Sequence, residues 1–157
     1  MKQSGCHGVS LGLESMSPRI LKLMGKMHNP SRAIKVLKVY KKYRIKTHLS
    51  VMFGFPTETK EEAEETLKFL VDNKNLYHSI STMNKFILND DMSSNELRKK
   101  LAIPINIKSR PYTKRMSYGR HEEYYDYIYK YKKRKGMSEK ELKDILLKSR
   151  ELLKDKF

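Results

Sequence analysis

Two short stretches of alternating residues, each ending in glycine and an acidic residue, constrain the fold of this chain most. Residues 9–15 (VSLGLES) and 48–58 (HLSVMFGFPTE) alternate apolar with small or polar residues, as half-buried strands do. Segments with helical spacing follow both stretches. Strands that alternate with helices form a parallel sheet with right-handed crossovers. We therefore predict an α/β fold, with a β-α-β-α-β order up to about residue 88 and a third strand at 79–88.

Helix-start signals place the helices between these strands. Ser-Pro at 17–18 and Asn-Pro at 29–30 each combine an N-cap residue with proline at the first helical position. Thr59 with Glu62 forms the pattern of a capping box. The helix that begins near Pro30 is expected to reach about Tyr43, because its apolar residues recur at helical spacing.

The rest of the chain is predicted to be a basic, tyrosine-rich and mainly helical extension. Residues 103–112 carry two prolines and are expected to be irregular. Apolar and tyrosine residues at 124, 127, 128 and 131 fall at helical spacing, which predicts a helix there. A Ser-x-x-Glu capping box at 138–141 marks a final helix. We therefore divide the chain into residues 1–90 and 91–157.

Cysteine content and hydropathy limit the class of protein. The single cysteine, Cys6, excludes an internal disulfide framework and a self-sufficient site with several cysteine ligands. No apolar run approaches the roughly 20 residues that a membrane span needs, and no signal-peptide core follows Met1. We expect a soluble, cytoplasmic protein without a membrane partner.

The strong positive charge leaves two interpretations open. The net charge is +16, and from Arg98 onward 19 Lys or Arg stand against 8 Asp or Glu. Such an excess suits nucleic acid or another polyanion. It also suits a lysine-rich solvated surface, which the dominance of Lys over Arg favours. No RNA-binding signature is present.

The ordered motifs of residues 1–90 resemble the radical S-adenosylmethionine (radical SAM) superfamily. The resemblance rests on four motifs in order, which are Gly5-Cys6, GLES at 12–15, ILKLMGK at 20–26 and GFPTET at 54–59. The chain is similar especially to cobalamin-binding and methylthiotransferase-like members. The resemblance implies a partial (β/α)6 barrel of the TIM type, of which this chain supplies the fourth to sixth strands. The carboxyl ends of such strands are where ligands bind.

The resemblance also implies a set of cofactor-binding residues. Glu14 would meet the ribose of S-adenosylmethionine, and Lys26 would lie near its carboxylate. The full set of candidates is Glu14, Ser15, Lys26, Ser50, Met52, Gly54 and Pro56. Each has a structural alternative: strand-end exposure for Glu14, a helix-end position for Lys26, simple packing for Ser50 and turn formation for Gly54 and Pro56. Glu58 and Thr59 are interpreted as helix-start residues, His48 as structural and Cys6 as a small buried residue.

The same resemblance leaves half of the barrel outside this chain. The C-x3-C-x2-C motif that holds the 4Fe-4S cluster is absent, and Thr57 stands where the family has glycine. We expect S-adenosylmethionine and the cluster in the complete protein, with cobalamin as an open alternative. No catalytic residue and no metal ligand is assigned here. The expected partner is the missing amino-terminal half of the barrel, so the chain is interpreted as a fragment.

Two other function classes stay open at this point. One is a small basic RNA-binding protein that uses the helical extension. The other is a remnant without catalysis that has a structural or interaction role.

Overall fold

The computed structural model describes every residue except 28, 88–95, 98, 102–104, 117–122 and 132–135, and between 102 and 135 it describes only backbone. The chain divides into two compact units. We call Met1–Lys85 together with Lys135–Phe157 the α/β unit, and Phe86–Arg134 the hairpin unit.

A parallel three-stranded sheet lies at the centre of the α/β unit. Its strands, in the spatial order β1-β2-β3, are β1 (Gly8–Glu14), β2 (Lys46–Phe53) and β3 (Ser79–Lys85). The connections are α1 (Pro18–Leu23), α2 (Pro30–Lys42) and α3 (Lys60–Asp72). Two short 3-10 turns, Lys2–Ser4 and Lys154–Lys156, lie near the chain ends. The predicted α/β fold and its β-α-β-α-β order are confirmed.

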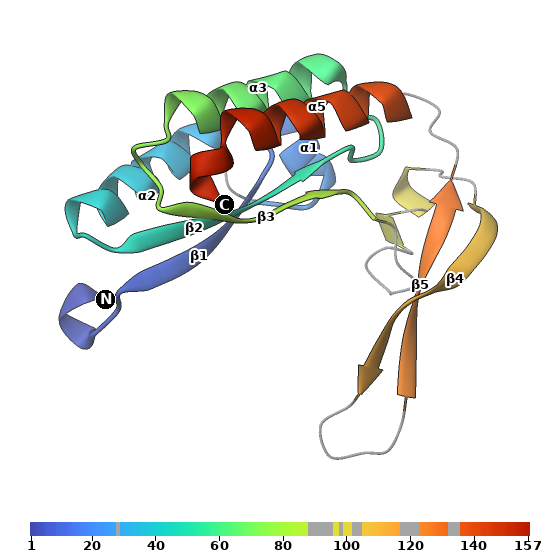
Figure 1. The fold of residues 1–157 in the computed structure, drawn as a ribbon, viewed down its shortest axis with the longest axis horizontal. Helices are drawn as coiled ribbons and strands as arrows, with labels where there is room; N and C mark the ends of the chain where they lie inside the picture. Colours follow the sequence, from blue (N-terminus) through green and yellow to red (C-terminus); the bar gives the residue numbers. More distant parts are fainter. Residues whose placement is uncertain (28, 88–95, 98, 102–104, 117–122, 132–135) are drawn as a thin grey trace. The chain divides into compact units, whose positions relative to one another are not determined.

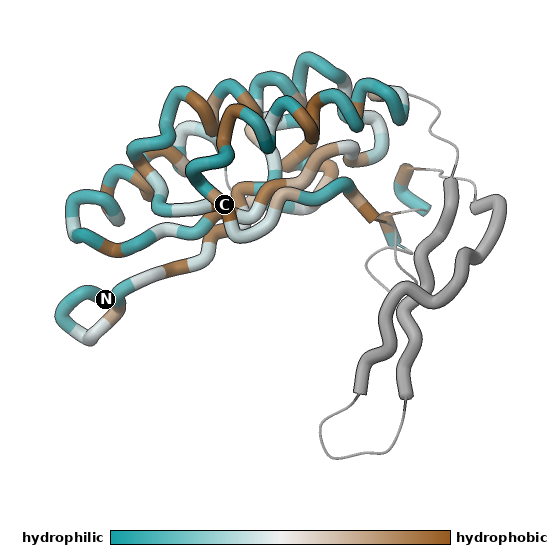
Figure 2. The backbone as a smooth tube through the Cα atoms, in the orientation of Figure 1, coloured by the Kyte–Doolittle hydropathy of each residue, from teal (hydrophilic) through white to brown (hydrophobic). Residues whose placement is uncertain are grey.

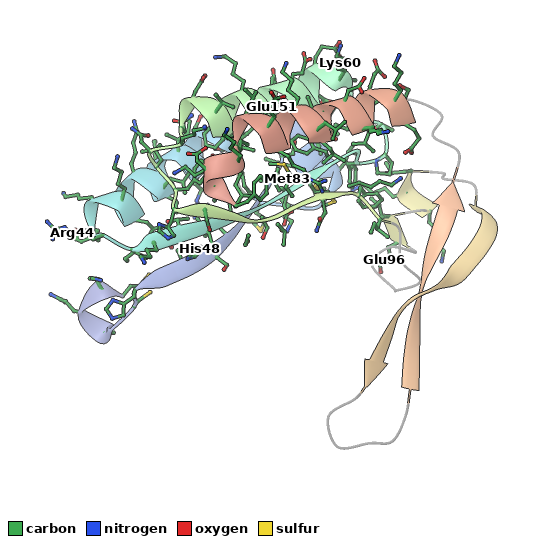
Figure 3. The ribbon with its side chains drawn as sticks, viewed as in Figure 1. Arg44, His48, Lys60, Met83, Glu96 and Glu151 are labelled. Atoms are coloured by element: carbon green, nitrogen blue, oxygen red, sulfur yellow. The ribbon has the colours of Figure 1, made fainter. Side chains whose placement is uncertain are left out.

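The helices of the α/β unit cover one face of this sheet and leave the other open (Figure 1). Alternation along β2 explains this, because Leu49, Val51 and Phe53 are buried while the residues between them are only half-buried. Figure 3 labels one residue on each face: Met83 lies on the helix side and His48 on the open side. The helices carry alternating hydrophobic and hydrophilic segments, as expected for elements with one buried face (Figure 2).

The predicted helix starts are confirmed by the hydrogen bonds that cap them. The Ser17 hydroxyl accepts a hydrogen bond from the Ile20 amide at 3.2 Å, and Asn29 Oδ1 accepts one from the Arg32 amide at 2.8 Å. Thr59 forms a full capping box with its partner three residues on. Each of these capping hydrogen bonds joins residues only three positions apart, which is why the local sequence predicts the helix starts.

The final helix, α5 (Glu139–Leu152), packs against α3 and β3. Its capping box at 138–141 is formed as predicted. Leu142 and Ile145 enter the core, and Glu139 Oε2 lies 3.2 Å from Nζ of Lys85 at the end of β3. The compact α/β unit thus includes the last helix; the proposed division at residue 90 stays a prediction.

The hairpin unit contains an antiparallel pair where the sequence suggested irregular chain and a helix. Its strands are β4 (Ile105–Met116) and β5 (Glu123–Tyr131). The predictions of irregular structure at 103–112 and of a helix through 124–131 are therefore wrong over these residues. Tyrosines at 125, 127, 129 and 131 also fit a period of two, and tyrosine favours strands. The register shifts beside Pro111, as expected for a proline within a strand.

Among the helices that the structure describes, none combines the length and the apolar character needed to cross a membrane.

Candidate functional site

The ends of β1 and β2 bring together the two acidic segments that the sequence singled out. Gly12 pairs with Ser50, and the register then shifts so that Glu14 pairs with Val51. Glu14 has a φ of 61°, so the chain turns sharply at the end of the strand. Its carboxylate lies back over Gly12: a Cβ at Gly12 would be 2.6 Å from Glu14 Oε1. Glycine at position 12 therefore leaves the space that this carboxylate occupies.

Lys26 reaches the same carboxylate, which joins two of the predicted site residues. Its Nζ lies 3.2 Å from Glu14 Oε1, and the side chains are 42% and 17% exposed, respectively. Gly25, with a φ of 73°, follows the C-cap of α1 and changes the direction of the chain just before Lys26. Half-exposed pairs of this kind contribute only about 0–1 kcal/mol to stability. The stability of the fold alone therefore does not explain why a carboxylate acceptor and a cation are paired at this strand end.

Hydroxyl groups line the open face of the sheet beside this pair. Ser50 Oγ lies 3.2 Å from Ser81 Oγ, and Ser81 Oγ donates to the Leu49 carbonyl at 3.0 Å. His48 Nδ1 lies 2.8 Å from Ser79 Oγ. Met52, half-buried, shares this face. Ser50 and His48 thus have partners within the sheet, and a role of Ser50 and Met52 toward a cofactor stays a prediction.

Ser15, in contrast, belongs to a buried network behind the strand end. Its side chain is fully buried, and its Oγ accepts a hydrogen bond from the Ser17 amide at 3.1 Å. The Met16 amide donates to Thr66 Oγ1 of α3 at 2.9 Å. These contacts fasten the β1–α1 turn to α3. They give Ser15 a structural function, and its predicted cofactor contact stays untested.

The loop between β2 and α3 is held closed by its own acidic residue. Gly54 has a φ of 78°, and its amide donates to Glu58 Oε2 at 2.5 Å. Glu58 is 1% exposed, and Pro56 is buried. The predicted turn-forming role of Gly54 and Pro56 agrees with this geometry, whereas their approach to a cofactor stays a prediction. Glu58 braces the loop just before the helix.

The segment just before α5 packs on the backbone of this loop. The Met137 amide donates to the Glu58 carbonyl at 2.8 Å. Gly136 lies so close that a Cβ there would be 2.6 Å from the same carbonyl oxygen. A Cβ at Gly54 would lie 2.6 Å from Leu142 Cδ2 of α5. Residues near the end of the chain therefore shape a loop at the carboxyl end of β2.

A charged cluster that the sequence did not reveal joins α1 to the same loop. Arg19 donates through Nε to Glu62 Oε1 at 2.8 Å and through Nη1 to Thr57 Oγ1 at 3.0 Å. Burial raises the pKa of Glu62, but hydrogen bonds from Arg19, the Thr59 amide and Ser17 outweigh it and lower that pKa to about 2. The same pairing, chiefly the hydrogen bond to Glu62, raises the pKa of Arg19. The cluster is thus charged at neutral pH.

The residues of the site fit S-adenosylmethionine better than they fit an iron–sulfur cluster. A carboxylate can accept hydrogen bonds from two vicinal hydroxyls, and a lysine can pair with a carboxylate. Within the described residues, no three His, Cys, Asp or Glu side chains gather as a metal site would require.

Cys6 is half-buried, which corrects the expectation of a buried residue, and its Sγ lies 3.6 Å from the Gly8 carbonyl oxygen.

Comparison with known proteins identifies the family of this segment. Residues 1–70 match the model of the Radical SAM superfamily. This segment belongs to the radical SAM superfamily. It contains β1, β2 and the Glu14–Lys26 pair, so all the cofactor-binding residues predicted from the sequence lie within the matched region. The resemblance to cobalamin-binding members in particular has no such support.

Two curated archaeal proteins are similar to the same part of the chain. An uncharacterized methyltransferase of Pyrococcus horikoshii is 48% identical over 69 residues, which are 44% of this chain and 15% of that protein. An uncharacterized protein of Methanocaldococcus jannaschii is 33% identical over 78 residues, 50% of this chain and 15% of that protein. The matched segment thus spans about 15% of the length of either relative.

A solved structure has the same fold. The archaeal Elp3 of Methanocaldococcus infernus, with residues 1–46 deleted, superposes with a TM-score of 0.54 and 22% identity. The match covers 62% of this chain and 23% of that one. The three parallel strands and their helices therefore form the kind of α/β arrangement found in a radical SAM partial barrel.

Proposed function

We propose that this chain supplies the carboxyl-terminal half of a radical SAM barrel and contributes to the binding of S-adenosylmethionine. One observation carries the proposal: within the segment that matches the superfamily, Glu14 and Lys26 form a pair 3.2 Å apart at the end of β1. Glu14 would accept hydrogen bonds from the ribose hydroxyls, and Lys26 would face the carboxylate of the cofactor. Gly12 supports this arrangement because it leaves room for the glutamate.

The part of this chain in the chemistry is binding and orientation. In this superfamily the bound cofactor supplies radical chemistry with the help of a reducing 4Fe-4S cluster. We assign the ligands of that cluster to the other half of the barrel, since among the described residues no three His, Cys, Asp or Glu side chains gather as a metal site would require. A rigid strand end suits the remaining task, because the Glu14 carboxylate is held by Lys26 and by the sharp turn at its own backbone.

The other half of the barrel would join at the outer edge of β1. In the described sheet β1 pairs with β2 alone, so its second edge presents backbone donors and acceptors to a further strand. In addition, a groove of about 180 Å³ lies between β1 and α2, lined mainly by Leu11, Leu13, Ala33, Val36 and Leu37. A strand with an apolar helix would satisfy both features. The partner is therefore proposed to be the amino-terminal half-barrel, on the same or a separate chain.

The named relative favours one reaction class for the whole protein. Since it is a methyltransferase, we propose methyl transfer for the complete enzyme, with cobalamin as an open cofactor. A second candidate function, RNA binding, follows from the net charge of +16. Its test is a gel shift with single-stranded RNA across a salt series, because phosphate contacts weaken steeply with salt.

The test of the cofactor proposal is a pair of substitutions at Glu14 in the assembled barrel. Glu14→Ala should weaken binding of S-adenosylmethionine by about 1.5–3 kcal/mol, the cost of losing hydrogen bonds to a charged acceptor. That is roughly a ten- to hundredfold rise in Kd by calorimetric titration. Glu14→Gln should cost less because it keeps one acceptor. Glu65→Ala, an exposed glutamate on α3, is the matched control. Equal affinities of Glu14→Ala and wild type would refute the ribose assignment.

A further inference from the structure

Thr57 adopts a backbone conformation that normally calls for glycine. Its φ is 74°, in the left-handed region, and its side chain is branched at Cβ. Such a conformation is strained for a non-glycine residue and persists only where the surroundings impose it. Three residues earlier, Gly54 meets the same demand with glycine at a φ of 78°. Something in the surroundings of Thr57 must therefore favour its strained conformation.

The contacts of Arg19 meet that requirement. Its guanidinium donates to both polar atoms of Thr57 that it can reach: Nη1 to Oγ1 at 3.0 Å and Nη2 to the carbonyl oxygen at 2.7 Å. A single planar group thus binds the side chain and the backbone of the strained residue together. Arginine, with five donors in a fixed fork, can do this while it also binds a carboxylate; lysine cannot.

Glu62 holds that guanidinium in place. It accepts from Arg19 Nε at 2.8 Å and from Nη2 at 2.5 Å, so the ion pair has two hydrogen bonds. The same carboxylate accepts from the Thr59 amide at 2.9 Å and from the Ser17 hydroxyl at 2.7 Å. The lowered pKa of Glu62 agrees with four hydrogen bonds to its charged form.

The arrangement links the two strand ends of the candidate site. Arg19 belongs to α1, which follows the end of β1 and Glu14, whereas Thr57 belongs to the loop that follows β2. Gly136 also packs against the backbone of Thr57 and Glu58. The loop is therefore contacted both by Arg19 and by the segment just before α5.

We infer that Arg19 is a positioning residue that stabilises the left-handed conformation of Thr57 and thereby fixes the β2–α3 loop relative to the end of β1. Its consequence for ligand binding rests on the proposed function; its structural part does not. Arginine at position 19 and a non-glycine residue at position 57 are thus coupled: if position 57 were glycine, the loop would keep its shape with less help from Arg19.

A double-mutant cycle tests this coupling in the full chain. The variants are Arg19→Ala, Thr57→Gly and the two combined, and the readout is hydrogen exchange of the Gly54 and Met137 amides, both bonded to Glu58. Arg19→Ala should accelerate exchange about tenfold or more, and in the Thr57→Gly background the acceleration should be less than about threefold. The difference reflects the backbone strain that glycine removes.

The opposite outcome is equally definite. If Arg19 only anchors α1 to α3 through Glu62, its replacement will have the same effect with threonine or glycine at position 57, and the inference is wrong. Should Arg19→Ala fail to fold, Arg19→Lys takes its place in the same cycle, because lysine keeps the charge and loses the fork.

A second readout separates this inference from the proposed function. In the assembled barrel, Arg19→Ala should raise the Kd for S-adenosylmethionine several-fold, and adding Thr57→Gly should restore most of the loss. Additive losses would again contradict the inference. If wild type itself binds no cofactor, the proposed function fails while the exchange cycle on the free chain still decides the role of Arg19.

Discussion

Replacing Gly136 by alanine should detach the start of α5 from the β2–α3 loop. At this position two costs coincide. Gly136 has a φ of 97°, and a Cβ would lie 2.6 Å from the Glu58 carbonyl oxygen, 2.9 Å from Thr57 C and 3.0 Å from Thr57 Cα. All three atoms are backbone, so the crowding cannot be relieved by a side-chain rotation.

The expected magnitude is the sum of these two costs. A left-handed conformation costs an alanine about 1–2 kcal/mol relative to glycine. Overpacking against fixed backbone adds about 1–3 kcal/mol. We therefore expect Gly136→Ala to lower the free energy of unfolding by about 2–5 kcal/mol, a large share of the roughly 5–15 kcal/mol typical of a domain.

Gly25→Ala provides the matched control. Gly25 also has a positive φ, 73°, but nothing lies within 4 Å of its Cβ position. Its replacement should therefore cost only the backbone strain. Urea unfolding of the two variants and wild type gives the comparison, and exchange of the Met137 amide reports on the docked segment. If Gly136→Ala costs no more than Gly25→Ala, the packing of this segment on the loop is not as described.

Three further predictions follow from other features. The pKa of Glu62 is lowered from 4.5 to about 2, so the stability that its charged form contributes is complete above pH 4.5 and is lost as the pH falls toward 2. We expect this contribution to be about 1–2 kcal/mol, because solvent screens a partly exposed group. Glu62→Gln should lack the pH-dependent change in urea unfolding measured at a series of pH values. Anaerobic reconstitution of the chain alone should give no stoichiometric iron–sulfur cluster by iron and sulfide analysis, and a cluster retained by the monomer would contradict this. Replacing 86–134 with a short glycine-serine linker should leave the α/β unit folded by circular dichroism and urea melting; loss of cooperative unfolding would refute its independence.

Local sequence signals predicted the α/β unit well because short-range physics sets its elements. The caps at Ser17, Asn29 and Thr59 act within three residues, and the alternation of β2 directly reports its two faces. The segment at 124–131 was predicted wrongly because its tyrosines fit both periods. Its pairing partner on β4 decides between them, and a local pattern does not contain that partner.

The residues of the candidate site likewise differ in whether a local sequence pattern could predict them. Glu14 and Lys26 were predicted from the family resemblance, through two nearby motifs at 12–15 and 20–26. The structure places the two side chains in contact, and their role toward a cofactor stays a prediction. The Arg19–Glu62 pair could not be predicted, because its members are 43 positions apart and each has an ordinary local explanation. The one available signal was Thr57 at a position where the family has glycine, which required a compensating partner that only the fold reveals.

The hairpin unit is inserted in the chain between β3 and α5, at the carboxyl end of the sheet. Residues 86–134 leave the α/β unit after β3 and return just before α5. Lys85 and Glu139, at the two points of attachment, form an ion pair at 3.2 Å, so the insertion starts and ends close together. Both points lie at the carboxyl end of the sheet, beside the loop that Gly136 contacts. In parallel α/β folds, loops at this end carry most differences in function. The sheet, the Glu14–Lys26 pair and the Arg19–Thr57 contact all lie within the α/β unit, so residues 86–134 take no part in them.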